Sequence, residues 1–448
     1  MLEDRSSFVS KNYSHETNPW AAYGIEGLEF RQEKQRSENN HGLELTLAYG
    51  GFPADSPPQD AANSKNVSHD QSMKNDGLDL RLGSLLDHVI PPPQPVNQHE
   101  PGLDTRHLIN AIGRDNSINC LIRCPRATYS SIALLNRSFR ELIKSGEIYK
   151  LRHDNKVVEY WVYFSCHLAK WEAFDPSNKI WIQLPIMDAD QCFQFSDKES
   201  MAVGTELLVL GRDLMGQASY KYSLLTNSWS LGQTMNIPRC LFGSASLGQV
   251  AIFAGGVNQN GMIMDTVELY DSRSGNWEML SSMIKPRKMC SGVYMDGKFY
   301  VIGGIGNEMK SLTCGEEYDL DVKKWTIIPN MSPMDGRGGR MAPPLVAVVG
   351  NELYAGDAAS MEVKKYEKKM KEWAVIGRLP ERAQSVDGWG MAFRGCGERV
   401  VVIGGPRRDN ANVVEIYSWM PSKGPVEWSM IGRKRSDSFV YNCAVMGC

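Results

Sequence analysis

Histidine is scarce in most of this 448-residue chain. All eight histidines lie at or before His167, so a histidine-ligated metal centre cannot be built from the residues that follow. None of the ten cysteines form a C-x-x-C pair, and no secretory signal occupies residues 1–20. This pattern predicts a reducing, intracellular context. No apolar run approaches the roughly 20 residues that cross a bilayer, so we expect a soluble protein without membrane contacts.

Clusters of basic residues are also lacking. The net charge is −3, and residues 1–100 hold 8 Lys and Arg against 15 Asp and Glu, while the remainder holds 41 against 37. A nucleic-acid footprint needs basic residues concentrated on one face. We therefore expect no binding to DNA or RNA.

Regularly spaced tryptophans are the strongest feature of the chain. Steps of 48 residues separate Trp181, Trp229, Trp277, Trp325 and Trp373, and Trp428 follows after 55. Each of the first five has an aromatic residue seven positions earlier: Phe174, Tyr222, Tyr270, Tyr318 and Tyr366. A period of this length predicts a repeat architecture.

Each repeat carries four short strand signals with near period-two alternation, and apolar runs at 250–256, 299–304 and 400–405 end in paired glycines. Such a unit resembles the kelch repeat, one blade of a β-propeller. The span 159–448 is close to six units, which predicts a mainly β fold with a six-bladed propeller over 156–448. The first unit lacks an inner strand, so we expect the C-terminal strand at 439–446 to complete blade one.

The first 101 residues form an acidic segment rich in Asn, Ser and Pro, which we expect to be disordered. Two L-x-L-x-L stretches within it look like the motif by which plant repressors recruit corepressors. Their leucines are Leu43, Leu45, Leu47, Leu78, Leu80 and Leu82. Patterns this short also occur by chance.

Residues 102–155 have helical character. Ile118, Leu121 and Ile122 share one face of a first helix that Pro125 ends, and a second helix is predicted near residues 129–144. A third short run contains Ile148 and Leu151. Three helices in about 40 residues are too few to form their own core, so they need a partner or must dock on the propeller.

The stretch 116–143 resembles an F-box, matched by Pro125 and by the basic and aromatic residues at 137–140, with Ile112 and Gly113 where the family has Leu-Pro. Together with the propeller it resembles the plant F-box/kelch-repeat proteins. That resemblance implies a non-enzymatic substrate receptor of a Skp–cullin–F-box ubiquitin ligase, without cofactors, in the nucleus, the cytoplasm or both. The F-box would bind the Skp-type adaptor, which joins a cullin scaffold, and the propeller would bind an unidentified client. The implied adaptor contacts are Ile112, Ile118, Leu121, Cys124, Pro125, Leu135 and Phe139.

Arginines recur just before the predicted inner strands, at Arg239, Arg287 and Arg340. With Arg337, Arg407 and Arg408 in polar loops, they predict a basic client-binding rim for an acidic or phosphorylated segment. The alternative is that these arginines bond to carbonyl groups of neighbouring blades.

Other functions of kelch propellers fit the residues less well. Copper oxidases and the iron-dependent specifier proteins use histidine ligands that blades two to six lack, so no metal site is expected. A sialidase-like site needs paired acids that do not recur with the arginines. The remaining alternative is an interaction scaffold with a corepressor-recruiting tail and no ligase role.

Overall fold

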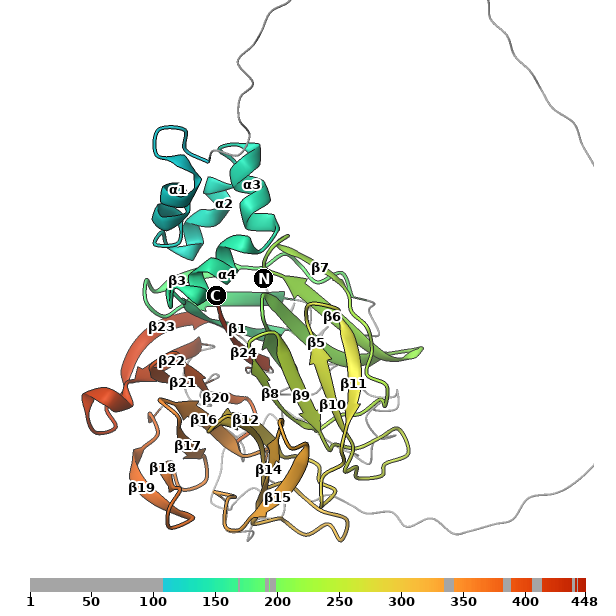
Figure 1. Ribbon diagram of the computed structural model, residues 1–448. Coiled ribbons are helices and arrows are strands. Elements are labelled where there is room, and N and C mark those ends of the chain that lie inside the picture. The colour runs from blue at the N-terminus through green and yellow to red at the C-terminus, as the bar shows by residue number, and fades with distance from the viewer. Residues whose placement is uncertain are drawn as a thin grey trace, which may run out of the picture. The chain divides into compact units, whose positions relative to one another are not determined.

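Figure 1 shows the computed structural model, which describes residues 108–167, 170–189, 193, 199–333, 342–381, 388–404, 413–436, 440 and 442–448. Helices precede a ring of β-sheets, and the two parts belong to one compact unit. The leucine stretches at 43–47 and 78–82 lie outside the described residues.

Short helices fill residues 108–154, here called the helical module. They are α1 (Gly113–Leu121), η2 (Arg126–Thr128), α2 (Tyr129–Ile132), α3 (Arg137–Lys144) and α4 (Glu147–Asp154). Where the sequence predicted one helix near 129–144, the structure has α2 and α3. The side chain of Asn136 accepts a hydrogen bond from the Phe139 amide at 2.9 Å, which caps α3 and starts a new helix there. Leu134 and Leu135 therefore lie in a turn.

The described strands form six antiparallel four-stranded sheets, which are the blades of a β-propeller. Blade one contains β24 (Asn442–Gly447), β1 (Tyr160–His167), β2 (Lys170–Asp175) and β3 (Ile180–Gln183); blade two contains β4 (Ser200–Val203), β5 (Glu206–Asp213), β6 (Gly216–Ser223) and β7 (Ser228–Leu231). Blade three contains β8 (Gly243–Leu247), β9 (Val250–Ala254), β10 (Val267–Asp271) and β11 (Asn276–Leu280); blade four contains β12 (Ser291–Met295), β13 (Lys298–Ile302), β14 (Gly315–Asp319) and β15 (Lys324–Ile328). Blade five contains β16 (Leu345–Val349), β17 (Glu352–Asp357), β18 (Glu362–Glu367) and β19 (Glu372–Arg378); blade six contains β20 (Met391–Cys396), β21 (Arg399–Gly404), β22 (Val413–Trp419) and β23 (Ser429–Arg435).

The ring closes by pairing the last strand of the chain with the first strand of the propeller. β24 runs antiparallel to β1 from the pair Tyr160 and Gly447 to the pair Ser165 and Asn442. The inner strand of blade one thus comes from the C-terminal end of the chain, and β24 also contacts the inner strands β4 and β20 of the neighbouring blades. This pairing removes an open sheet edge.

The tryptophan period reflects two contacts made in successive blades. The residue seven positions earlier lies directly opposite in the outer hairpin, as for Tyr270 and Trp277, whose ring centroids are 5.0 Å apart. The indole of five of the tryptophans also donates a hydrogen bond to the backbone at or just after the end of the last strand of the preceding blade. These Nε1 bonds join Trp229 to the carbonyl of Pro185, Trp277 to Gln233, Trp325 to Ser281, Trp373 to Met331 and Trp428 to Arg378. Each of these five tryptophans therefore fixes its blade to the preceding one.

Candidate protein-interaction sites

The helical module is attached to blade one by a cluster of charged and aromatic side chains. The Arg126 guanidinium lies 3.9 Å from the ring centroid of Trp161 and donates to the Tyr163 hydroxyl at 3.0 Å. Glu159 accepts hydrogen bonds from the Arg126 amide at 3.0 Å and from Arg152 Nη2 at 2.6 Å. Burial raises the pKa of Tyr163 to about 12, so its hydroxyl is neutral and available as an acceptor.

Apolar packing continues from the module into blades one and two. Ile148 and Tyr149 of α4 are buried in the same core as Trp161 and Trp171 of blade one. Gly146 has φ +78°, and a Cβ added there would lie 3.4 Å from Leu225 of blade two. The helices therefore gain part of the core that they lack from the propeller of their own chain.

Four large apolar side chains of the described module remain exposed: Ile109, Ile112, Leu134 and Leu135. The two leucines are adjacent, with 76% and 71% of their surface exposed. Adjacent exposed apolar side chains offer a partner a surface to bury. This part of the module can bind a partner without unfolding.

The predicted adaptor contacts fall into two groups. Ile112, Pro125 and Leu135 are exposed and Ile118 and Cys124 are half-buried, so a partner can reach them. Leu121 and Phe139, in contrast, are buried in the core that the module shares with the propeller. The prediction that these two contact the adaptor directly is therefore corrected, because their apolar surface is already covered.

Leu134 was missed by the sequence reasoning. A continuous helix over 129–144 would place Leu135 on its apolar face and Leu134 off it, whereas the break before α3 leaves both leucines exposed in one turn. The asparagine at 136, a strong N-cap residue, was the available signal.

Arg239 and Arg287 occupy equivalent positions in the interior of two successive blades. Arg239 pairs with Glu268 and Arg287 with Glu316, each at 2.5 Å, and all four side chains are 0% exposed. Burial lowers the pKa of Arg239, and the carboxylate of Glu268 opposes that effect. The prediction that these two arginines form an exposed client-binding rim is wrong, because neither can reach a client.

These pairs connect strands to the links between blades. Arg287 Nη1 donates to the carbonyl oxygens of Gly303 and Cys314, and Glu316 accepts hydrogen bonds from the amides of Ile284 and Lys285. Both arginines bond to carbonyl groups, as the alternative held, but these groups belong to the blade that each arginine precedes and not to a neighbouring blade. Arg337, Arg340, Arg407 and Arg408 lie outside the described residues, and their role in a rim stays a prediction.

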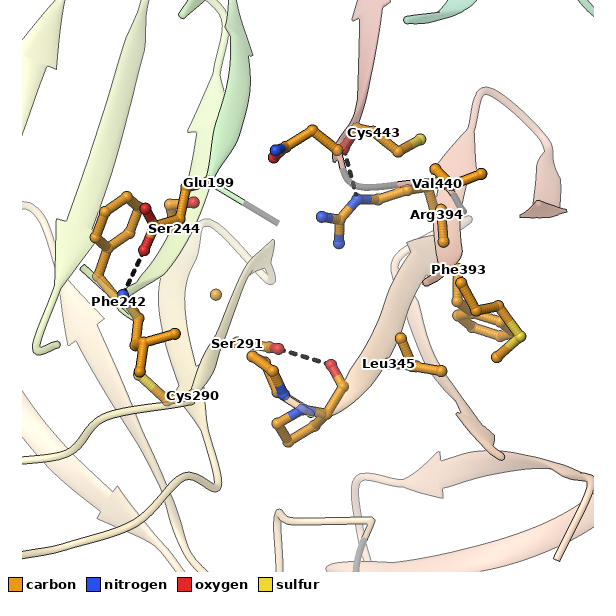
Figure 2. Close-up of a pocket in the computed structure, with 17 residues that line it drawn as sticks. Glu199, Phe242, Ser244, Cys290, Ser291, Leu345, Phe393, Arg394, Val440 and Cys443 are labelled. Atoms are coloured by element: carbon orange, nitrogen blue, oxygen red, sulfur yellow. Dashed lines mark hydrogen bonds between the residues drawn. The ribbon is translucent and has the colours of Figure 1, made fainter. Parts of the chain in front are cut away.

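An axial cavity lies where the six inner strands begin. Its volume is about 40 Å³, and all six blades line it. Figure 2 shows the Arg394 guanidinium directed into it across from Glu199. The helical module attaches near the other ends of the inner strands, because Glu159 pairs with Cys448, the residue that follows β24. The cavity and the helical module are therefore at opposite ends of the propeller axis.

The Kelch motif model matches residues 238–284 and 286–332, which contain the two buried Arg–Glu pairs. Similar proteins from Arabidopsis thaliana include F-box/kelch-repeat protein At1g26930, 56% identical over 77% of this chain and 84% of the relative, and F-box/kelch-repeat protein SKIP11, 61% identical over 77% and 76%. F-box/kelch-repeat protein At1g74510 is 51% identical over 76% of this chain and 79% of its own length. The chain belongs to the plant F-box/kelch-repeat proteins.

This F-box/kelch-repeat protein has no group of three or more His, Cys, Asp or Glu arranged to hold a metal ion within the described ranges. In the same part of the chain, no helix is both long and apolar enough to span a membrane.

In this F-box/kelch-repeat protein, Arg287→Ala is expected to lower the free energy of unfolding by about 3–5 kcal/mol, because Glu316 loses its buried counter-ion. Urea unfolding followed by tryptophan fluorescence measures the change. Arg273→Ala is the control, since Arg273 pairs with Asp271 at the surface and should leave the urea midpoint unchanged. Equal midpoints for Arg287→Ala and the native protein would contradict a structural role for the pair.

Proposed function

We propose that this protein is a substrate receptor of a Skp–cullin–F-box ubiquitin ligase. In this proposal the helical module binds a Skp-type adaptor, the adaptor joins the cullin scaffold, and the propeller binds the client protein to be ubiquitinated. The receptor itself is a non-catalytic subunit. The observation that carries the proposal is the exposed pair Leu134 and Leu135 in a small helical module, in a chain whose relatives are named F-box/kelch-repeat proteins.

The positions of the two candidate surfaces support this division of roles. The module packs on blades one and two near the ends of the inner strands, and the axial cavity opens among their beginnings. Exposed apolar residues also occur in the connections between the second and third strands of blades two, three and four: Leu214, Met215, Met262 and Met309. Methionine suits a surface that adapts to a bound chain. We propose that the client contacts this end of the propeller.

Binding of the purified full chain to a recombinant Skp-type adaptor tests the receptor role. We expect a one-to-one complex with a Kd below about 1 µM, equivalent to roughly −8 kcal/mol, which co-elutes with the cullin scaffold in gel filtration. An intact chain that binds no Skp-type adaptor would favour the alternative, an interaction scaffold without a ligase role. Circular dichroism establishes that the protein used is folded.

A further inference from the structure

Arg394 breaks the pattern of the inner strands. It pairs with Val401 in β21, three residues before Gly404. At the same register, the inner strands of the other five blades carry uncharged residues: Met201, Ala245, Val293, Val348 and Val445. Five blades thus pack with an uncharged side chain at this position. The scaffold does not require an arginine here, which suggests that Arg394 serves a ligand.

In the described part of the chain, the Arg394 guanidinium makes one hydrogen bond. Its Nε donates to the carbonyl oxygen of Cys443 at 3.3 Å, and within the described residues no other hydrogen bond or ion pair involves this guanidinium. Among the described residues, four of its five N–H groups thus have no partner and can bind a ligand. The side chain is half-buried, so solvent can reach it while the surrounding protein reduces the screening of its charge.

Among the described residues that line the axial cavity, Arg394 is the one that carries a positive charge. Glu199 is buried, and its carboxylate accepts a hydrogen bond from the Leu241 amide at 2.5 Å. Burial raises the pKa of the Cys290 thiol to about 11, so this thiol is uncharged near pH 7. Ser244 and Ser291 add hydroxyl groups to the lining. Because the Leu241 amide holds the Glu199 carboxylate, the charged donors of this lining are those of Arg394, and a small anion is the ligand that suits them.

The volume of the cavity limits the size of the ligand. A cavity of about 40 Å³ exceeds the roughly 10–15 Å³ that one water needs, so a small charged group can enter it. Arginine binds carboxylates with two parallel hydrogen bonds. We propose that Arg394 in the axial cavity binds one carboxylate group of the client, from an acidic side chain or a chain terminus. That the carboxylate belongs to a client protein rests on the receptor role proposed above.

Acetate is the simplest probe of this site. In protein labelled with ¹⁵N-arginine, the Arg394 side-chain signal is assigned by its loss in Arg394→Met, and we expect it to shift saturably with sodium acetate at constant ionic strength. Acetamide, which has the same shape without the charge, should produce no shift. Arg394→Met places in blade six the residue that blade two has at Met201, so this variant is expected to fold.

Peptide pools then separate the two sources of the carboxylate. One amidated pool has glutamate or glutamine at a fixed central position, and a second has a free or an amidated C-terminus. We expect Arg394→Met to weaken binding of at least one carboxylate-bearing pool by tenfold or more. Arg399→Met is the matched control, because Arg399 lies on the same hairpin outside the cavity lining and should leave binding unchanged.

The proposal is overturned if acetate gives no saturable shift of the Arg394 signal, or if chloride at the same concentration reproduces the shift. It is equally overturned if the peptides bind Arg394→Met as tightly as the native protein. Binding of Arg394→Met to the Skp-type adaptor is measured in parallel and should be native-like. An adaptor that fails to bind the native chain would remove the receptor role without affecting the acetate result.

Discussion

Replacing Leu134 and Leu135 together with glutamate is expected to weaken binding to the Skp-type adaptor by about 100-fold or more, equivalent to roughly 2.7 kcal/mol. Both side chains are largely exposed, so the free protein loses little packing, whereas a complex would have to bury two charges against an apolar surface. Isothermal titration calorimetry with the full chain measures the change in Kd.

The matched control is the same double substitution at Leu214 and Met215, another adjacent apolar pair, which is 81% and 95% exposed in the hairpin between β5 and β6. This control should keep native affinity for the adaptor. If both double variants bind the adaptor as the native protein does, the turn between α2 and α3 is not the contact surface. The thermal midpoint of each variant shows whether it is folded. This design avoids Leu121 and Phe139, whose substitution would damage the shared core.

Deleting residues 442–448 is expected to abolish the single cooperative unfolding transition of the propeller and to lower its thermal midpoint by about 10 °C or more. The deletion removes β24, leaves β1 with an unpaired edge and takes away the buried Cys443, Ala444 and Met446. Differential scanning calorimetry measures both effects.

A synthetic peptide with the sequence of residues 440–448 provides the control for this deletion. Added in excess, it should restore part of the lost stability, because it supplies the same edge with the same register. A truncated protein that unfolds at the native temperature without the peptide would show that the ring does not depend on this strand.

The spacing of aromatic residues predicted the propeller for a physical reason. A step of seven places two residues opposite each other in a tight hairpin, as in the pair Tyr318 and Trp325, and a step of 48 brings the same hairpin to the next blade. Both requirements are local to a blade and its neighbour, so they repeat visibly. The same period contains a signal that was overlooked, the methionines six residues after four successive tryptophans. Met187, Met235, Met283 and Met331 are all buried.

The candidate binding residues were harder to predict because the exposure of a side chain depends on residues that are close to it in space but distant in the sequence. The recurrence of Arg239 and Arg287 before inner strands suggested a rim, but Glu268 and Glu316 follow each arginine by 29 residues and pair with it inside the blade. Arg394 differs from the uncharged residues at the equivalent position of the other inner strands, so a search for recurring residues does not find it. That difference appears only when strand register is known.

The sequence by itself determined the number of blades, because each blade needs its own strands, aromatic pair and closing tryptophan, and these requirements are met by neighbours along the chain. Only the tertiary structure decided which polar and apolar side chains are available to other molecules. It buried Arg287 against Glu316, enclosed Phe139 among apolar side chains of the helical module, left Leu134 and Leu135 exposed in one turn and left Arg394 facing a cavity. The physical reason is that burial is set by contacts between segments far apart in the chain, which residue type and periodicity do not specify.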